Sequence, residues 1–293
     1  MSTTVDPGGW ALVLHGGAKE IAPEKEAANR AGCLRALLSG AAVLRAGGSA
    51  VDAVEAAIRV LEDDATFNAG RGSVRNSDGE VEMDAAMMDG ATLDVGGVGA
   101  IRDVRHPVAV ARLMLRETPT LLVAEGAQRF AAAQGAELRG PAELLAAAGD
   151  AAHDTVGCIA LDSRGDLAAG TSTGGLEGCH PGRLGDSPVP GLGFYADNGL
   201  GAVAFSGDGE SISRCMLAAH VMHRLEGGSP QAAIESAIAR LGRVGGDAGG
   251  IVLDPAGNIG WAHNSPHFAV GMVRGNDDRP RIYLSKGEEA SHD

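Results

Sequence analysis

The sequence predicts an α+β fold in which antiparallel sheets are covered by layers of helices. Two observations lead to this prediction. Apolar runs occur in pairs joined by short turns, as in β-hairpins, and helical segments follow one another in pairs instead of alternating with single strands. A doubly wound sheet would need regular strand–helix–strand alternation. The composition, 44% apolar with only 3% aromatic residues, indicates a core made mainly of Ala, Val, Leu and Ile.

The N-terminal half opens with a buried strand followed by two helices. The apolar run 10–14 leads into His15-Gly16-Gly17-Ala18, as expected of a strand that continues into a loop. Ser49 and Asp52 form a capping signal ahead of apolar residues at helical spacing, which predicts the start of the second helix. The other elements expected in this half are turn-rich strands over 64–106 and helices near 107–116 and 121–134.

The C-terminal half begins after a linker. Residues 140–154 are rich in Ala and Gly and show no amphipathic stripe, which predicts a mobile connection. The apolar runs 155–161 and 167–173 then flank a turn signal, which predicts a β-hairpin in the core. The further elements expected are a Gly/Pro-rich loop at 177–193, a strand near 201–206, helices near 210–225 and 229–241, a hairpin of 250–253 with 259–262, and a last strand near 268–273.

Charge and composition exclude several classes of function. The net charge of −14 argues against a nucleic-acid partner, because such proteins neutralise phosphates with clustered Lys and Arg. No stretch approaches the ~20 apolar residues that span a bilayer, and the first ten residues lack a leader pattern, so a cytoplasmic protein is expected. The four cysteines have no C-x-x-C spacing, which predicts free thiols instead of disulfides or a zinc site.

Hydroxyl residues gather where the predicted hairpin begins and ends. Thr155 opens the first strand directly after the linker, and Thr171-Ser172-Thr173 ends the second strand. If the two strands pair, these strand ends lie side by side. A threonine at the start of a strand is ordinary β-propensity, so only the combination points to a site.

Two further segments carry groups that suit an amino-acid ligand. Arg183 and Asp186 lie in a loop constrained by Gly and Pro, and opposite charges on a rigid loop suit a zwitterion. Residues 205–210 join a predicted strand to a predicted helix, so their backbone N–H groups can face an anion or a developing oxyanion.

Together these pieces resemble the plant-type asparaginase and isoaspartyl-peptidase family, and the match covers nearly the whole chain. The motifs that carry it are HGGA at 15–18, FNAGRGS at 67–73, VEMDA at 81–85, MDG at 88–90, TVG at 155–157, TSTGG at 171–175, PGRLGDSP at 181–188, YADN at 195–198 and SGDGE at 206–210. The resemblance implies a four-layer αββα sandwich of the N-terminal-nucleophile hydrolase type. It also implies one domain over 1–293, cut by the protein itself between Asp154 and Thr155 into an α chain of 1–154 and a β chain of 155–293.

The resemblance also assigns roles to residues. Thr155 would be the nucleophile, its freed α-amine the base, and Thr173 the hydroxyl that holds and polarises the nucleophile. Ser206 and Gly207 match the oxyanion positions, where the family more often has Thr-Gly. The positions implied to bind or support the substrate are Arg183 for its α-carboxylate, Asp186 with Leu184, Gly185, Ser206, Gly207, Asp208 and Gly209 for its α-ammonium and backbone, and Asn68 and Gly16 as supporting residues.

No cofactor is expected for catalysis, but a structural sodium ion is implied by a matching loop. Relatives hold this ion by backbone carbonyls, which leave no side-chain signature. The corresponding carbonyls here belong to Leu61, Glu62, Asp64, Phe67, Ala69 and Arg71. The resemblance further implies a small-molecule substrate and a homodimer of cleaved αβ units.

The predicted reaction is hydrolysis of L-asparagine, of β-aspartyl dipeptides, or of both, since these substrates share the same aspartyl half. Two alternatives stay open. An aspartylglucosaminidase shares the cut site and the Gly-Thr-Ser-Thr motif but has Asn-Gly where this chain has Gly174-Gly175. A non-catalytic amino-acid-binding relative would use Arg183 and Asp186 without needing Asp154, Thr155 and Thr173 together.

Overall fold

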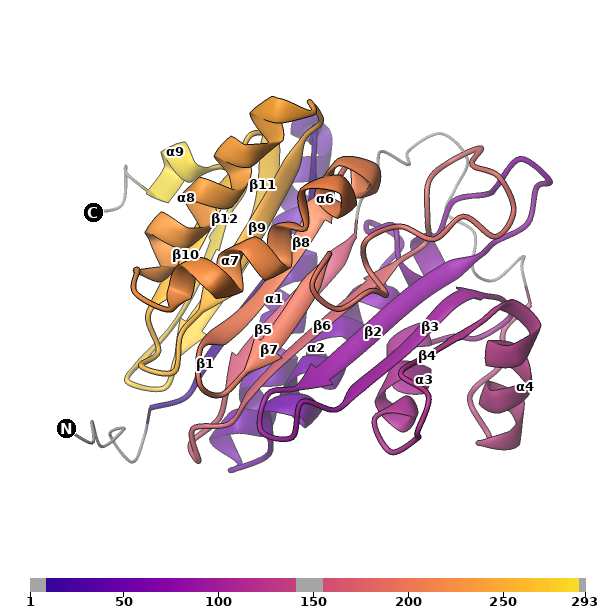
Figure 1. Cartoon of the computed structure of the whole chain (residues 1–293), viewed down its shortest axis with the longest axis horizontal. Helices are drawn as coiled ribbons and strands as arrows, with labels where there is room; N and C mark the ends of the chain where they lie inside the picture. The colour runs from indigo at the N-terminus through magenta and orange to yellow at the C-terminus, as the bar shows by residue number, and fades with distance from the viewer. Residues whose placement is uncertain (1–8, 141–154, 290–293) are drawn as a thin grey trace.

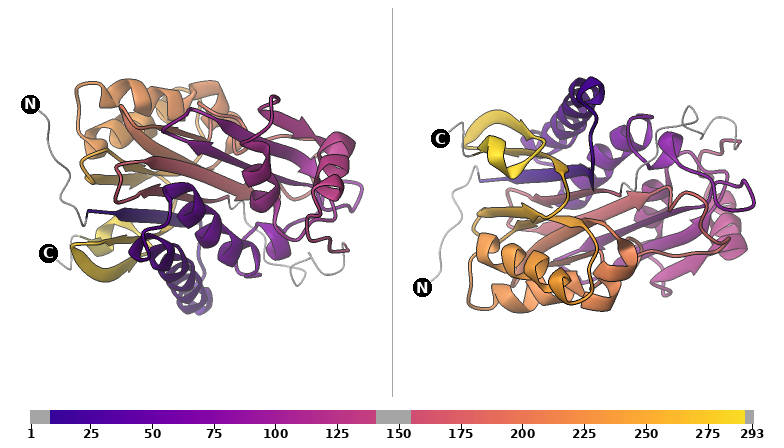
Figure 2. Two further views of the ribbon diagram at one scale, coloured as in Figure 1. Left: turned by 90° about the horizontal axis from the view of Figure 1, so that it is seen from below. Right: turned by 90° about the horizontal axis from the view of Figure 1, so that it is seen from above.

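The computed structural model describes residues 9–140 and 155–289, and these residues form a four-layer sandwich. Two sheets stack face to face, and helices cover the outer face of each (Figures 1 and 2). Figure 2 shows α1 on one side, α7 and α8 on the other, and the sheets between them. The α+β class and the αββα layering expected from the sequence are thereby confirmed.

The larger sheet has eight strands in the order β12-β11-β1-β5-β6-β2-β3-β4. All neighbours pair antiparallel except β3 and β4, which are parallel. Its strands are β1 (Ala11–Lys19), β2 (Met83–Asp89), β3 (Val95–Ile101), β4 (Leu121–Val123), β5 (Val156–Leu161), β6 (Leu167–Thr173), β11 (His267–Arg274) and β12 (Asp277–Tyr283).

The smaller sheet is wholly antiparallel, in the order β10-β9-β8-β7. Its strands are β7 (Phe194–Asp197), β8 (Gly201–Gly207), β9 (Ala248–Leu253) and β10 (Ile259–His263). The predicted hairpin of 250–253 with 259–262 is the β9–β10 pair, so this prediction is confirmed.

Helices on each side bury one face against the nearer sheet. The large sheet is covered by α1 (Pro23–Arg45), α2 (Ala50–Glu62), α3 (Pro107–Met114) and α4 (Ala124–Ala133), and the small sheet by α7 (Leu217–Leu225) and α8 (Pro230–Arg240). The shorter helical segments are η1 (Gly70–Gly72), α6 (Gly209–Cys215), η2 (Leu241–Arg243) and α9 (Lys286–Glu289). Ser49 caps α2 as the sequence predicts, because its Oγ accepts the N–H of Asp52 at 3.1 Å.

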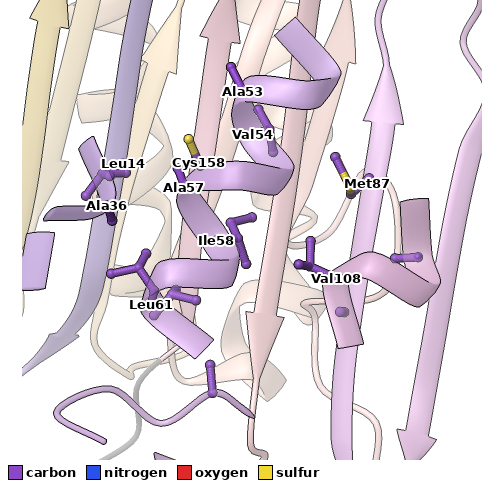
Figure 3. Close-up of a cluster of buried hydrophobic side chains, with 14 of the residues drawn as sticks. Leu14, Ala36, Ala53, Val54, Ala57, Ile58, Leu61, Met87, Val108 and Cys158 are labelled. Carbon is purple, nitrogen blue, oxygen red and sulfur yellow. The ribbon is translucent and has the colours of Figure 1, made fainter. Parts of the chain in front are cut away.

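The core follows the alternation of strand side chains. In β1, Leu12 and Leu14 face the helix layer, whereas Ala11 and Val13 face the space between the sheets. Figure 3 shows the helix side of this core, where Ala57, Ile58 and Leu61 of α2 lie over the strands with Cys158 and Met87. Burial of these apolar faces on both sides of the large sheet fixes its strands between two layers.

The hairpin that carries the predicted site has the expected register. Val156 of β5 pairs with Ser172 of β6, and Leu161 pairs with Leu167 beside the turn. Continued by one residue, this register places Thr155 opposite Thr173. The predicted strand pairing is confirmed, and it brings the two hydroxyl-bearing strand ends together.

Some elements differ from expectation. The single helix expected over 210–225 is divided into α6 and α7, because Met216 adopts the left-handed conformation with φ of 52°. The expected helix 121–134 begins only at Ala124, and the residues before it form β4. Strands β7 and β12 were not expected, and each lies at the edge of its sheet.

The described residues bear on two further predictions, the state of the cysteines and the lack of a membrane-spanning helix. All four cysteines are free thiols, and Cys33, Cys158 and Cys215 are buried. Within 9–140 and 155–289, no helix is both long and apolar enough to cross a bilayer.

Candidate active site

A pocket of about 450 Å³ is lined in part by the first residues of α6, the helix labelled in Figure 1. The segments that line it are far apart in the sequence: the end of β1, the start of β5, the end of β6, the following loop, and the junction of β8 with α6. The predicted site residues on its wall are Thr155, Thr173, Arg183, Asp186, Gly207, Asp208 and Gly209. The fold therefore gathers one candidate site from both halves of the chain.

Thr155 lies at the base of this pocket with both of its polar groups engaged. Only 7% of the residue is exposed. Its N–H donates to Ser206 Oγ at 3.2 Å, and its Oγ1 lies 3.1 Å from Ser187 Oγ. Thr173 is equally buried, and its Oγ1 accepts the N–H of Gly175 at 3.2 Å. The nucleophile candidate is thus held in one orientation by neighbouring hydroxyls.

Ser187 is a site residue that the sequence analysis did not single out, although it lies in the PGRLGDSP motif. It lines the pocket, is 1% exposed, and contacts Thr155 Oγ1. A buried serine has no distinctive pattern in a sequence, so only the folded loop reveals this contact.

Ser206 ties the end of β8 to two other strands. Its Oγ accepts the N–H of Ala18 at 3.1 Å as well as that of Thr155. With both lone pairs used, the O–H proton is the remaining hydrogen-bonding capacity of this hydroxyl. The next residue must be glycine, because Gly207 has a φ of 139° and a Cβ there would lie 2.2 Å from the carbonyl oxygen of Asp247.

The junction after Gly207 differs from expectation in one respect. The N–H of Asp208 donates to the carbonyl oxygen of Asp247 at 2.8 Å, so it is engaged within the protein. Gly209, in contrast, lies close to the side chains of Asp186 and Arg183. A Cβ on Gly209 would lie 2.8 Å from Asp186 Oδ1 and 2.9 Å from Arg183 Nη2.

Arg183 is paired with Glu210, a second residue that the sequence analysis did not single out. Arg183 Nε donates to Glu210 Oε1 at 3.0 Å, and Nη2 donates to Oε2 at 2.8 Å. This two-point contact lowers the pKa of the Glu210 carboxyl. Because the pair uses only two of five guanidinium N–H groups, Arg183 keeps donors for a ligand.

Two buried carboxyl groups lie near Arg183. Burial raises the pKa of Asp186 to about 7, although the positive charge of Arg183 works in the opposite direction. Burial likewise raises the pKa of Asp84 to about 6, against the effect of the Ala100 N–H that this carboxylate accepts at 2.8 Å. Asp84 lies opposite Thr173 in the β2–β6 pair. One oxygen of each carboxylate, Oδ2, has no hydrogen-bond partner within the described part of the chain.

Five of the residues predicted from the resemblance do not line the pocket, and one of them is Ser206, described above. The Leu184 side chain is directed at Gly99, where a Cβ would lie 2.4 Å from its Cδ2, and 36% of Leu184 is exposed. Gly185 lies against the guanidinium of Arg183, with Nη1 only 2.9 Å from where its Cβ would be. The remaining two of this group are Asn68, which contacts the lining residue Gly175, and Gly16 in β1.

Asn68 supports the turn that follows Thr173. Its Nδ2 donates to the carbonyl oxygen of Gly175 at 2.8 Å, and its own carbonyl accepts the N–H of Gly174 at 2.7 Å. Gly16 allows close packing in β1, since a Cβ there would lie 2.5 Å from the Phe67 ring. Both residues therefore act on the shape of the loops around the pocket.

His15 lies in β1 opposite Gly157, close to the start of β5, but it is not a base candidate. It is fully buried against Phe268, with ring centroids 5.2 Å apart, and burial lowers its pKa to about 3. A neutral imidazole held this far below its ordinary pKa is a weak proton acceptor at neutral pH.

In the segment implied to hold sodium, the backbone packs closely against carbonyl oxygens of the same segment. A Cβ at Gly70 would lie 2.4 Å from the carbonyl oxygen of Glu62, and one at Gly72 would lie 1.9 Å from that of Phe67. Among the residues described, no group of three His, Cys, Asp or Glu side chains could hold a metal. A cation in this segment would therefore depend on carbonyl ligands, which is the donor type that hard cations prefer.

The predicted cut site is described on one side only. Thr155 is placed as above, whereas Asp154 and almost all of the linker 140–154 lie outside the described residues.

The chain matches known proteins over nearly its whole length. The model of a family described as "Asparaginase" matches residues 8–149 and 142–281, which together span nearly the whole chain. A Xenopus laevis protein named isoaspartyl peptidase/L-asparaginase is 41% identical over 298 residues, covering 94% of this chain and 96% of that protein. Proteins of the same name from Bos taurus and Danio rerio are each 42% identical, covering 88% and 86% of this chain and 92% and 87% of their own lengths. The chain therefore belongs to the asparaginase family.

Proposed function

We propose that this protein is a self-processing threonine hydrolase that cleaves β-aspartyl amide bonds in L-asparagine and in β-aspartyl dipeptides. The observation that carries the proposal is the position of Thr155. It directly precedes the buried strand β5 and lines the same pocket as Arg183 and Asp186, and its nitrogen and hydroxyl contact Ser206 and Ser187. The names of the relatives, isoaspartyl peptidase/L-asparaginase, support the same reaction.

Self-cleavage would supply the base. In the uncut chain the nitrogen of Thr155 belongs to a peptide bond and cannot accept a proton. Cutting between Asp154 and Thr155 converts it to an α-amine, whose reference pKa is about 7.7–8.0. The products would be an α chain of 1–154 and a β chain of 155–293, which remain one folded domain because β5 lies between β1 and β6 of the large sheet.

The charges of the pocket suit the aspartyl half of the substrate. Arg183 would bind the α-carboxylate through the N–H groups that Glu210 does not use. Asp186 would bind the α-ammonium group. Burial raises its pKa despite the nearby charge of Arg183, and its Oδ2 has no hydrogen-bond partner among the described residues, so a bound ammonium group would supply both a donor and a further positive charge.

The chemistry would use only groups of the chain itself. Thr155 Oγ1 attacks the side-chain amide carbon while the α-amine takes its proton, and that proton passes to the leaving nitrogen, which departs as ammonia or as an amino acid. Water then hydrolyses the aspartyl ester and restores Thr155. Ser206 O–H and the Gly207 N–H would stabilise the oxyanion, and Thr173 would polarise the nucleophile.

Three other features are part of the proposal. The segment 61–71 would hold a structural sodium ion through its carbonyls, so melting should occur at a higher temperature in NaCl than in choline chloride of equal concentration.

The cleaved units would form a homodimer, which sedimentation of the purified protein tests. The cytoplasmic location stays a prediction that cell fractionation can examine.

The decisive experiment measures processing and turnover together. Intact mass should show two chains separated between residues 154 and 155, and the cut protein should release aspartate from L-asparagine and from a β-aspartyl dipeptide. Acetylation of the new N-terminus should abolish turnover while circular dichroism stays unchanged. Full activity after verified acetylation would contradict the proposed base, and a chain that stays intact on prolonged incubation would contradict self-processing.

A further inference from the structure

Ser187 is the side chain that contacts the oxygen of the proposed nucleophile. Its Oγ lies 3.1 Å from Thr155 Oγ1, and both residues are buried. The resemblance implies the polarising role for Thr173, whose Oγ1 accepts a hydrogen bond from the N–H of Gly175. A second hydroxyl, from a different part of the chain, thus reaches the reacting atom.

The backbone of Ser187 is fixed on both sides. Thr171 Oγ1 donates to the carbonyl oxygen of Ser187 at 2.7 Å, and Val189 N–H donates to the carbonyl oxygen of Asp186 at 3.1 Å. The following residue, Pro188, restricts the conformations open to Ser187. The turn therefore fixes the backbone from which the Ser187 hydroxyl extends towards Thr155.

The same turn carries the groups proposed to bind the substrate. Asp186 directly precedes Ser187, and Arg183 lies three residues before Asp186. A zwitterion that binds Arg183 and Asp186 therefore acts on the turn that presents Ser187 to Thr155. Substrate binding and the orientation of the nucleophile are linked through five consecutive residues.

We propose that Ser187 is a further catalytic residue, which donates its hydroxyl proton in a hydrogen bond to Thr155 Oγ1. This inference rests on the proposed function above. A threonine oxygen has two lone pairs and one proton. The Ser187 donor occupies one lone pair, which leaves the second for attack and directs the Thr155 proton towards its own nitrogen. Ser187 itself gains and loses no proton.

The test compares three variants of Ser187 with a matched control. In Ser187→Ala, kcat for L-asparagine per cut chain should fall about tenfold, the scale of one lost hydrogen bond, while KM stays within about twofold. Ser187→Thr keeps the hydroxyl and should recover kcat to within about threefold of the original. Ser187→Cys keeps the volume but offers only a weak donor, so it should resemble Ser187→Ala.

Ser265→Ala is the control, because Ser265 is also buried and donates to a backbone carbonyl, that of His267 at 2.7 Å. It should leave kcat unchanged. Intact mass gives the cut fraction of every variant, so that kcat refers to processed chains only. A folded Ser187→Ala chain that stays uncut also supports the proposal, since the same oxygen attacks in processing. If Ser187→Ala does not fold, Ser187→Cys is judged by the same criteria.

Several results would overturn the proposal. These are an unchanged kcat in Ser187→Ala, a rise in KM with constant kcat, or equal losses in Ser187→Ala and Ser265→Ala. Failure of the proposed function gives a different result, because the unmodified chain itself would then be inactive on all β-aspartyl substrates.

Discussion

Two buried aspartates at opposite ends of the β5–β6 hairpin are treated very differently by the fold. Asp162, in the turn, is fully buried and accepts backbone N–H groups from Ala50, Arg164 and Asp166. Asp186, beside the strand ends at the pocket, is 3% exposed, and within the described residues its Oδ2 accepts no hydrogen bond. The carboxylate of Asp162 thus has a full set of hydrogen-bond donors, whereas that of Asp186 does not.

The difference separates a structural role from a functional one. A buried carboxylate with several donors stabilises its turn, because each lone pair lost to water is replaced. A buried carboxylate without such donors raises the free energy of the free protein and gains when a cation binds. The closed end of the hairpin therefore fixes the register of β5 and β6, and the open end keeps a carboxylate that suits the charged substrate proposed above.

The largest effect is expected from removing the proposed nucleophile at the open end. Thr155→Ala should remain uncut, and turnover should fall by at least about 10⁴-fold, because neither the hydroxyl nor a free α-amine remains. Intact mass and aspartate release measure both outcomes. Ser163→Ala, in the turn at the closed end, should be cut and active. If the Thr155→Ala chain is cut or active, the pocket end of the hairpin does not supply the nucleophile, and this distinction between the two ends fails.

The next effect concerns the arginine at each end. Arg183→Ala should raise KM about 30- to 150-fold for L-asparagine and for β-aspartyl dipeptides alike, because it removes a charge-assisted contact of about 2–3 kcal/mol to their shared carboxylate. Arg164→Ala removes the partner of Asp162 and should lower stability without changing KM. Steady-state kinetics on both substrates decide the matter, and an unchanged KM in Arg183→Ala would remove Arg183 from the binding site.

The smallest effect separates the two aspartates by stability. The folded-state pKa of Asp186 is raised to about 7, above its ordinary value of 3.8. The stability linked to this group is fully present below pH 3.8 and is lost as pH rises through about 7. Asp186→Asn should therefore increase the free energy of unfolding at pH 8, by about 1–3 kcal/mol, and should raise KM for the substrate.

Asp162→Asn should lower the free energy of unfolding, because an amide cannot accept as many hydrogen bonds as the carboxylate it replaces. It should leave KM unchanged. Denaturant titrations at pH 5 and pH 8 measure both variants. Equal destabilisation by the two substitutions would contradict the distinction between a satisfied and an unsatisfied carboxylate.

Much of the fold could be predicted from local patterns, and the exceptions have physical reasons. Alternating apolar runs and short turns identify the β5–β6 and β9–β10 hairpins, which are both present. Strand β12 escapes prediction because its sequence, DDRPRIY, is charged and contains a proline, as suits an edge strand that pairs on one side only. The break at Met216 escapes because no glycine marks its left-handed conformation.

The sequence by itself determined the order of the motifs, the start of a core strand at Thr155, and the pairing that sets Thr155 opposite Thr173. These depend on interactions between residues near one another along the chain. Only the tertiary structure decided which distant side chains complete the site. Ser187 reaches Thr155 Oγ1, Glu210 pairs with Arg183, and Asp186 lacks part of its hydrogen-bonding complement. Such contacts depend on how loops meet at the end of the sandwich, and no local periodicity encodes that meeting.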